Sequence, residues 1–137
     1  MTAIHPADDN GVDLGSSSYS YKDLYVDGTA NIASMNMGVN STITSSGTFN
    51  GTATIIPINS SNGNITITID TEQLVAGRIL IFRQISGNNL SITIETEGSE
   101  QISAGTYTGD TITLGSQVSK QLFIFSDGSN WYDIVQG

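Results

Sequence analysis

The stretch from Ile65 to Ile69 reads Ile-Thr-Ile-Thr-Ile and decides the class of fold. Successive side chains of a β-strand point to opposite faces of a sheet, so this alternation predicts a strand with one buried and one solvated face. A denser apolar run from Arg78 to Ile85 predicts a central strand that is buried on both faces. Residues 87–89, Gly-Asn-Asn, then predict a hairpin turn into a return strand from Leu90 to Ile94.

Further short strands are predicted toward the C-terminus. They lie near Thr111–Leu114, at Leu122–Phe125 and at Trp131–Val135, and the turn signal Asp127–Asn130 joins the last two. Only Thr71–Ala76 indicates a helical turn. Many short strands separated by frequent turns predict an all-β fold, a sandwich or a barrel-like domain.

The composition and the residue pattern change along the sequence and predict three segments. Residues 1–32 are polar and rich in turns, with a short strand candidate at Asp23–Val26, and we interpret them as an N-terminal anchoring arm. Residues 33–52 are interpreted as a short stalk-like β segment, because apolar and polar residues alternate from Ala33 to Val39 and apolar residues are sparse after that. Such a stretch cannot bury a core alone, which favours three chains around a shared axis. Residues 53–137 are interpreted as a C-terminal β knob domain.

Composition excludes several classes of partner. Only 12% of the 137 residues are charged, against about 25% in typical globular proteins, and Ser, Thr, Asn and Gly supply the polar character instead. The net charge is −9, and no two basic residues are adjacent. Nucleic acids and anionic membranes both require clustered basic side chains, so neither is expected as a partner. The basic residues are Lys22, Arg78, Arg83 and Lys120.

The cysteine content and the first ten residues indicate in which compartment the protein is made. There is no cysteine, which excludes disulfides and thiolate metal sites. The first ten residues have neither a basic region nor an apolar stretch, so no signal peptide is predicted, and no apolar run is long enough to span a bilayer. We therefore expect synthesis in a cytoplasm.

Candidates for chemistry are few. The single histidine, His5, precedes a proline in a polar segment, so no nucleophile–base pair is indicated. Glu95 and Glu97 share one face of a predicted strand, which favours a solvated face over a glycosidase pair across a cleft. The acidic segment Asp8–Asp13 lacks the register of a calcium loop and is interpreted as a turn. We predict no catalytic, cofactor-binding or metal-binding residue, and no enzymatic activity.

Two segments resemble bacteriophage fibre proteins. Residues 13–18, Asp-Leu-Gly-Ser-Ser-Ser, continued by residues 21–28, Tyr-Lys-Asp-Leu-Tyr-Val-Asp-Gly, are similar to a fibre motif in which a leucine-glycine-serine turn leads into an aromatic strand. Residues 125–132 are similar to the final hairpin of many phage fibre and capsid-surface domains. The resemblance implies a homotrimer on a virion, attached to a capsid or tail protein and made in the host cytoplasm.

Three placements follow from this resemblance. The short chain favours a capsid-surface decoration protein or head fibre that is attached by its N-terminal arm. The stalk-like middle and the knob leave open a tail-fibre tip, a receptor-binding protein that contacts the host surface and its glycans. A polysaccharide-degrading spike is a third hypothesis, but the sequence offers no carboxylate-lined groove for it.

Apolar residues of the first two segments are the candidate contacts with other subunits or with the particle. Tyrosine buries a large area and keeps one polar group, so the arm tyrosines are interpreted as subunit contacts, with stacking on a sugar as the alternative. The candidates are Leu14, Tyr19, Tyr21, Leu24, Tyr25, Met35, Met37 and Val39.

Overall fold

The computed structural model describes residues 16, 18–19, 21–86, 90–115 and 120–134. Its contacts divide the chain into two units, Met1–Met35 and Asn36–Gly137, and each is described by itself. The described part of the first unit contains no helix and no strand, so the strand prediction at Asp23–Val26 is wrong. A strand needs a neighbour to exchange backbone hydrogen bonds with, and the described part of this unit holds no second strand.

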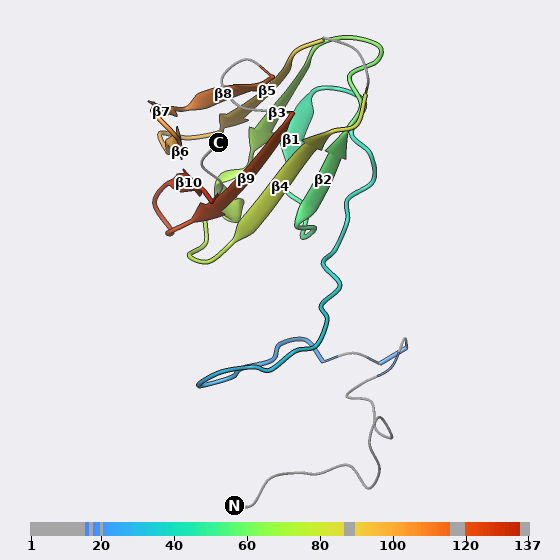
Figure 1. Ribbon diagram of the computed structural model, residues 1–137, viewed down its shortest axis with the longest axis vertical. Helices are drawn as coiled ribbons and strands as arrows, with labels where there is room; N and C mark the ends of the chain where they lie inside the picture. Colours follow the sequence, from blue (N-terminus) through green and yellow to red (C-terminus); the bar gives the residue numbers. More distant parts are fainter. Residues whose placement is uncertain (1–15, 17, 20, 87–89, 116–119, 135–137) are drawn as a thin grey trace, which may run out of the picture. The chain divides into compact units, whose positions relative to one another are not determined.

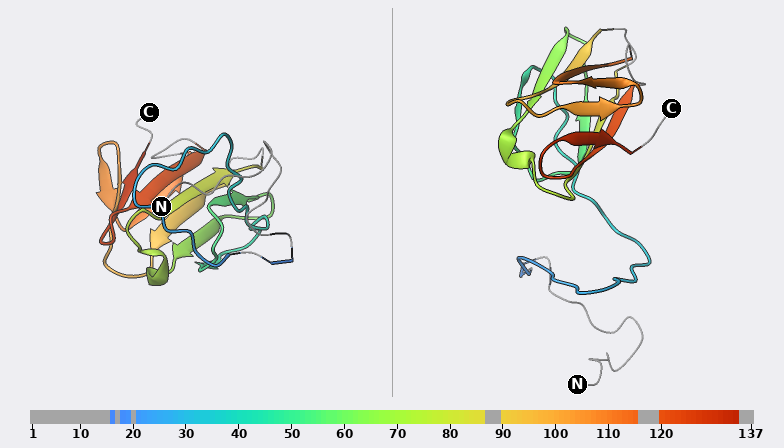
Figure 2. Two further views of the ribbon diagram at one scale, coloured as in Figure 1. Left: turned by 90° about the horizontal axis from the view of Figure 1, so that it is seen from below. Right: turned by 90° about the vertical axis from the view of Figure 1, so that its left-hand side faces the viewer.

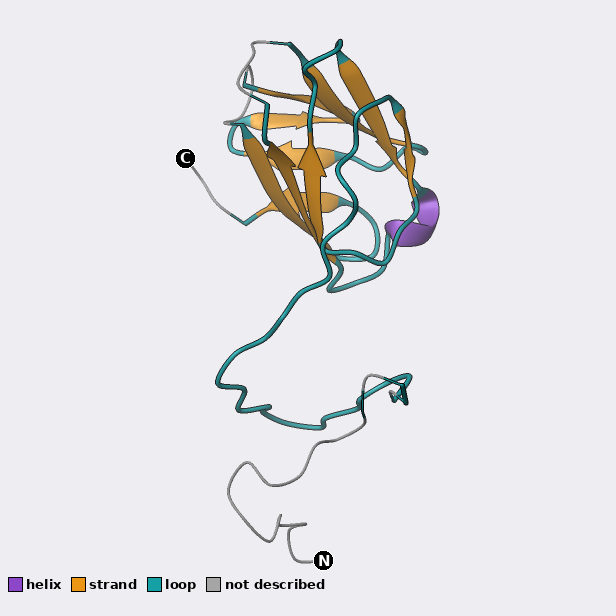
Figure 3. Cartoon of the chain, turned by 90° about the vertical axis from the view of Figure 1, so that its right-hand side faces the viewer, coloured by secondary structure: helices purple, strands orange, loops and turns teal. Residues whose placement is uncertain are grey.

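The helices and strands described in the second unit are all β-strands except for one short 3-10 helix, which confirms the all-β prediction (Figures 1 and 3). They form a four-stranded sheet of order β1-β3-β5-β8 and a six-stranded sheet of order β2-β4-β9-β10-β6-β7. The strands are β1 Gly47–Phe49, β2 Ile55–Ile58, β3 Ile65–Ile69, β4 Ile79–Gln84, β5 Ile92–Thr96, β6 Ile102–Ala104, β7 Tyr107–Gly109, β8 Thr111–Leu114, β9 Gln121–Ser126 and β10 Trp131–Asp133.

One helical turn lies where the sequence predicts it. The 3-10 helix η1 (Thr71–Gln73) follows Asp70, whose carboxylate caps it by accepting a hydrogen bond from the backbone N–H of Glu72 at 2.8 Å. In the part of the chain that the structure describes, no helix is long and apolar enough to cross a membrane.

The first five strands wind as a coil that alternates between the two sheets (Figure 2). β1, β3 and β5 run parallel in one sheet, and β2 and β4 run parallel in the other. Before β1, Val39 and Ile43 already form parallel bridges with Ile55 and Ile58 of β2. β8 and β9 then pair antiparallel with β5 and β4. Each turn of the coil therefore adds one strand to each sheet.

This coil shows that the hairpin predicted across residues 87–89 is wrong. β4 pairs with β2 and β9, whereas β5 pairs with β3 and β8, so the chain between them passes from one sheet to the other. Residues 87–89 themselves lie outside the described residues. A turn signal specifies that the chain changes direction, but not which sheet the next strand joins.

One hydrophobic core fills the space between the sheets. In the four-stranded sheet, Ile65 and Ile67 are buried and pair in register with the buried Ile92 and Ile94. The inward residues of the six-stranded sheet complete this core with larger side chains. They include Leu80, Phe82, Leu122, Ile124 and Trp131.

β4 is buried on one face only, so the prediction of a strand buried on both faces is wrong. Leu80 and Phe82 are fully buried, whereas Ile79 and Ile81 are partly exposed and Arg83 is exposed. A continuous apolar run has no period, and it therefore does not reveal that its outward side chains face solvent in this unit.

The segment before β1 holds no strand, so the strand prediction from Ala33 to Val39 is also wrong. The carbonyl oxygen of Gly38 accepts hydrogen bonds from the backbone N–H groups of Thr54 (2.9 Å) and Ile55 (3.0 Å). Asn40 and Ile43 donate their backbone N–H groups to the carbonyl oxygens of Ile55 (2.8 Å) and Pro57 (2.9 Å), so this segment is held to β2 by isolated bridges and not as a continuous strand. The contacts assign residues 36–52 to the same unit as residues 53–137. Whether the arm 1–32, the stalk 33–52 and the knob 53–137 act as separate parts stays a prediction.

Candidate functional site

The arm residues singled out from the sequence are exposed in the structure. Tyr25 is 90% exposed and Tyr19 is 82% exposed, and Tyr21 and Leu24 are exposed as well. Every described residue up to Met35 is exposed, so these side chains have no buried packing site in their own unit.

Ser16 forms a local turn at the start of the described arm. Its backbone N–H donates to the carbonyl oxygen of Tyr19 at 2.7 Å, and its hydroxyl oxygen accepts from the backbone N–H of Tyr19 at 3.0 Å. The resemblance to the fibre motif implies a turn at this point. The remaining arm candidate, Leu14, lies outside the described residues.

The three candidates of the predicted stalk do not form one surface. Met35 ends the first unit, whereas Met37 and Val39 belong to the second. All three are exposed, and Val39 is held against the edge of the six-stranded sheet by its bridge to Ile55. Val39 is therefore the only candidate among the described ones that pairs with a strand.

The two outward faces of the second unit differ in chemistry. The four-stranded sheet turns threonines and one glutamate outward: Thr48, Thr66, Thr68, Thr93, Glu95, Thr111 and Thr113. The six-stranded sheet instead exposes apolar side chains. Of these, only Val39 was a candidate from the sequence, and Ile79 and Ile81 were predicted to lie in a strand buried on both faces. We name the following residues the outer apolar face: Val39, Ile55, Ile79, Ile81, Phe123 and Phe125.

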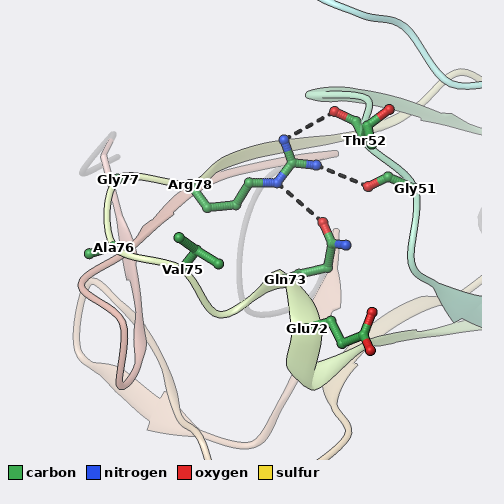
Figure 4. Close-up of a pocket in the computed structure, with 8 residues that line it drawn as sticks. All are labelled: Gly51, Thr52, Glu72, Gln73, Val75, Ala76, Gly77 and Arg78. Atoms are coloured by element: carbon green, nitrogen blue, oxygen red, sulfur yellow. Dashed lines mark hydrogen bonds between the residues drawn. The ribbon is translucent and has the colours of Figure 1, made fainter. Parts of the chain in front are cut away.

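A pocket of about 430 Å³ lies between the segment before β2 and the segment that leads into β4 (Figure 4). Arg78 extends across it, and its guanidinium donates to the carbonyl oxygens of Thr52 (3.1 Å), Gly51 (3.1 Å) and Ala53 (2.8 Å). Its Nε also donates to Oε1 of Gln73 at 3.2 Å. Partial burial lowers the pKa of Arg78 through desolvation. These bonds occupy the guanidinium with backbone acceptors, so Arg78 is a structural clamp rather than an anion-binding group.

Arg78→Met is expected to lower the free energy of unfolding by about 2 kcal/mol, because hydrogen bonds to a charged group contribute about 1.5–3 kcal/mol. The matched control is Arg83→Met, which removes one exposed bond to Gln121 (3.1 Å) and is expected to change stability by less than about 0.5 kcal/mol. Urea unfolding followed by the fluorescence of Trp131, the single tryptophan, measures both. Equal losses at the two positions would contradict the clamp.

The two glutamates considered as a glycosidase pair each accept a threonine hydrogen bond. Thr68 donates its hydroxyl to Glu95 at 2.7 Å, and Thr71 donates its hydroxyl (2.7 Å) and its backbone N–H (3.1 Å) to Glu97. The bonds from Thr71 lower the pKa of Glu97. A general acid needs a raised pKa, so this environment is opposite to what a glycosidase acid requires.

A buried polar network connects the ends of β2 and β4. The amide of Gln84 donates to the hydroxyls of Ser60 (3.2 Å) and Ser86 (3.3 Å), and these two hydroxyls lie 3.0 Å apart. The Gln84 amide also donates to the carbonyl oxygen of Leu90 at 3.4 Å, so these buried polar groups are hydrogen-bonded, as buried polar groups in folded proteins are. Within the described residues, no group of three or more His, Asp or Glu side chains is placed to hold a metal ion.

Comparisons of this chain with protein-family models, with curated proteins and with solved structures gave no match. A functional proposal therefore rests on three surfaces of the molecule, which are the exposed arm, the outer apolar face and the threonine face of the four-stranded sheet.

Proposed function

We propose that this chain is a non-enzymatic structural protein of a bacteriophage virion. It acts as a homotrimeric subunit on the capsid surface, as a decoration protein or head fibre, and residues 1–32 attach it to the particle. The observation that carries this proposal is the contrast between the two units. The described arm exposes its tyrosines and Leu24, whereas the second unit buries a core of its own.

An arm of this kind gains order only against a partner. Its aromatic side chains have no buried site of their own, and burying an aromatic side chain against a partner gives a large stabilisation. An extended segment also offers its backbone N–H and C=O groups to an exposed strand edge of a capsid protein, in the manner of β-strand addition. Neither type of contact requires a cluster of basic side chains, so both are open to a chain with a net charge of −9.

The polar surface of the second unit suits an outward position on a particle. Carboxylates and threonines at the four-stranded sheet keep that face hydrated, and a net negative charge keeps particles apart. The polysaccharide-degrading spike finds less support, because Glu97 has a lowered pKa and Glu95 is engaged by Thr68.

Deletion of residues 1–28 is expected to leave a folded, soluble second unit that binds particles at least about a hundredfold more weakly than the full chain. The arm carries several aromatic anchors, and loss of one such anchor typically costs about 2 kcal/mol or more. Co-sedimentation with particles that lack the subunit measures binding, and Trp131 fluorescence verifies folding.

A full-length variant with serine at Tyr19, Tyr21 and Tyr25 is the matched test, because it keeps the chain length and removes the aromatic rings. Binding that survives in both variants would refute attachment by the arm. Binding to isolated tails but not to heads would instead favour the tail-fibre tip that contacts the host surface.

A further inference from the structure

The outer apolar face consists of side chains aligned in register across neighbouring strands. One row runs from Val39 across β2, β4 and β9 of the six-stranded sheet through successive pairs, to Ile55, to Ile81 and to Phe123. Beside it, Ile79 pairs with Phe125, and the ring of Phe125 lies 5.5 Å from that of Tyr132 on the next strand. The apolar side chains therefore form one continuous surface rather than scattered points.

Strand formation does not require apolar residues at these positions. Threonine has a β-propensity similar to that of isoleucine, and the other sheet places threonine at the equivalent outward positions. Thr93, for example, stands between Thr66 and Thr113 on the middle of its sheet, as Ile81 stands between Ile55 and Phe123. Isoleucine and phenylalanine on one face only indicate that this face is covered by another molecule.

Charge indicates what the covering molecule is. The rows of the outer apolar face contain no charged side chain; Arg83 lies at one end of the face, and Asp127 follows β9 at the other. The threonine face carries Glu95, with Glu97 directly after β5. In a chain with a net charge of −9, copies repel one another wherever carboxylates meet. In a symmetric oligomer, the same residue of every subunit lies close to the symmetry axis, so the centre of the contact between subunits favours uncharged residues.

We propose that further copies of this chain cover the outer apolar face, so that the six-stranded sheets face the symmetry axis of the oligomer. The proposal rests on the homotrimer proposed above and names the surface through which its subunits meet. Ile81 and Phe123 lie at the centre of the contact, and Phe125 lies nearer its rim. The arm remains available for the particle.

Sedimentation equilibrium of the full chain at micromolar concentration tests the contact. The wild type is expected to sediment as a trimer, and Ile81→Lys and Phe123→Lys are each expected to weaken association at least about thirtyfold, as loss of a central anchor does. Thr93→Lys is the matched control, since it places the same side chain at the centre of the other sheet, and it is expected to leave the trimer intact. Trp131, which is buried, reports by fluorescence whether each variant is folded.

Each result decides between the proposals. A trimer that survives Ile81→Lys and Phe123→Lys would overturn the outer apolar face as the contact while the homotrimer stands. A monomeric wild type would overturn both, and the face would then belong to a different partner. If the central variants do not fold, Phe125→Lys decides, because that side chain is already 36% exposed and lysine is tolerated there without burial. An unchanged trimer in folded Phe125→Lys would count against the proposal.

Discussion

Phe82→Ala is expected to lower the free energy of unfolding by about 3–5 kcal/mol. The Phe82 side chain is fully buried on β4, the strand that pairs with both β2 and β9. Its ring meets that of Phe49 edge-on at a centroid distance of 6.2 Å, and this contact joins the two sheets. Removing the ring loses its burial and leaves a cavity between the sheets, because neighbouring strands held by hydrogen bonds cannot close it fully.

The same variant should loosen the edge of the four-stranded sheet. β1 is three residues long and pairs only with β3 among the described strands, so Phe49 is its main link to the core. Hydrogen exchange at Gly47–Phe49 should therefore rise more than exchange at β5. Phe125→Ala is the control, and at a concentration where the wild type is monomeric its free energy of unfolding is expected to fall by only about 1 kcal/mol, because Phe125 is exposed. Losses of equal size at Phe82 and Phe125 would contradict the burial of Phe82.

Ile94→Asn is expected to destabilise the second unit by about 4 kcal/mol or more. The Ile94 side chain is fully buried, and truncation of a buried isoleucine costs about 2–5 kcal/mol. A buried amide without partners adds about 1–3 kcal/mol. Since small proteins are stable by only about 5–15 kcal/mol, this variant is expected to be largely unfolded at 37 °C.

The neighbouring substitution Thr93→Asn is the matched control. Thr93 points to the opposite face of the same strand, where an amide remains hydrated, so a change of less than about 1 kcal/mol is expected. Thermal unfolding followed by circular dichroism compares the two variants. If Thr93→Asn were as damaging as Ile94→Asn, the inward and outward assignment of β5 would be wrong.

The candidate contact residues were predicted from the sequence only in part. The tyrosines of the arm were singled out by their residue type, and the structure leaves them exposed. Of the outer apolar face, only Val39 was singled out from the sequence. Ile79 and Ile81 belong to a continuous apolar run, and such a run reads the same whether its second face packs on a helix, on a sheet or on another subunit. The clamp of Arg78 was also missed, because its acceptors are backbone carbonyls 25 to 27 residues away.

Local alternation was sufficient to assign the all-β class and the inward residues of β3 and β5, because a side chain's face depends only on its position along its own strand. The partners of those strands depend on contacts between distant residues, and no local signal encodes them. β4 pairs with β2 and β9 and not with β5. This pairing depends on how both sheets pack together on one hydrophobic core, to which successive turns of the coil contribute their buried isoleucines. For the same reason, the outward face of β4 became visible as a surface only once the position of every other strand was known.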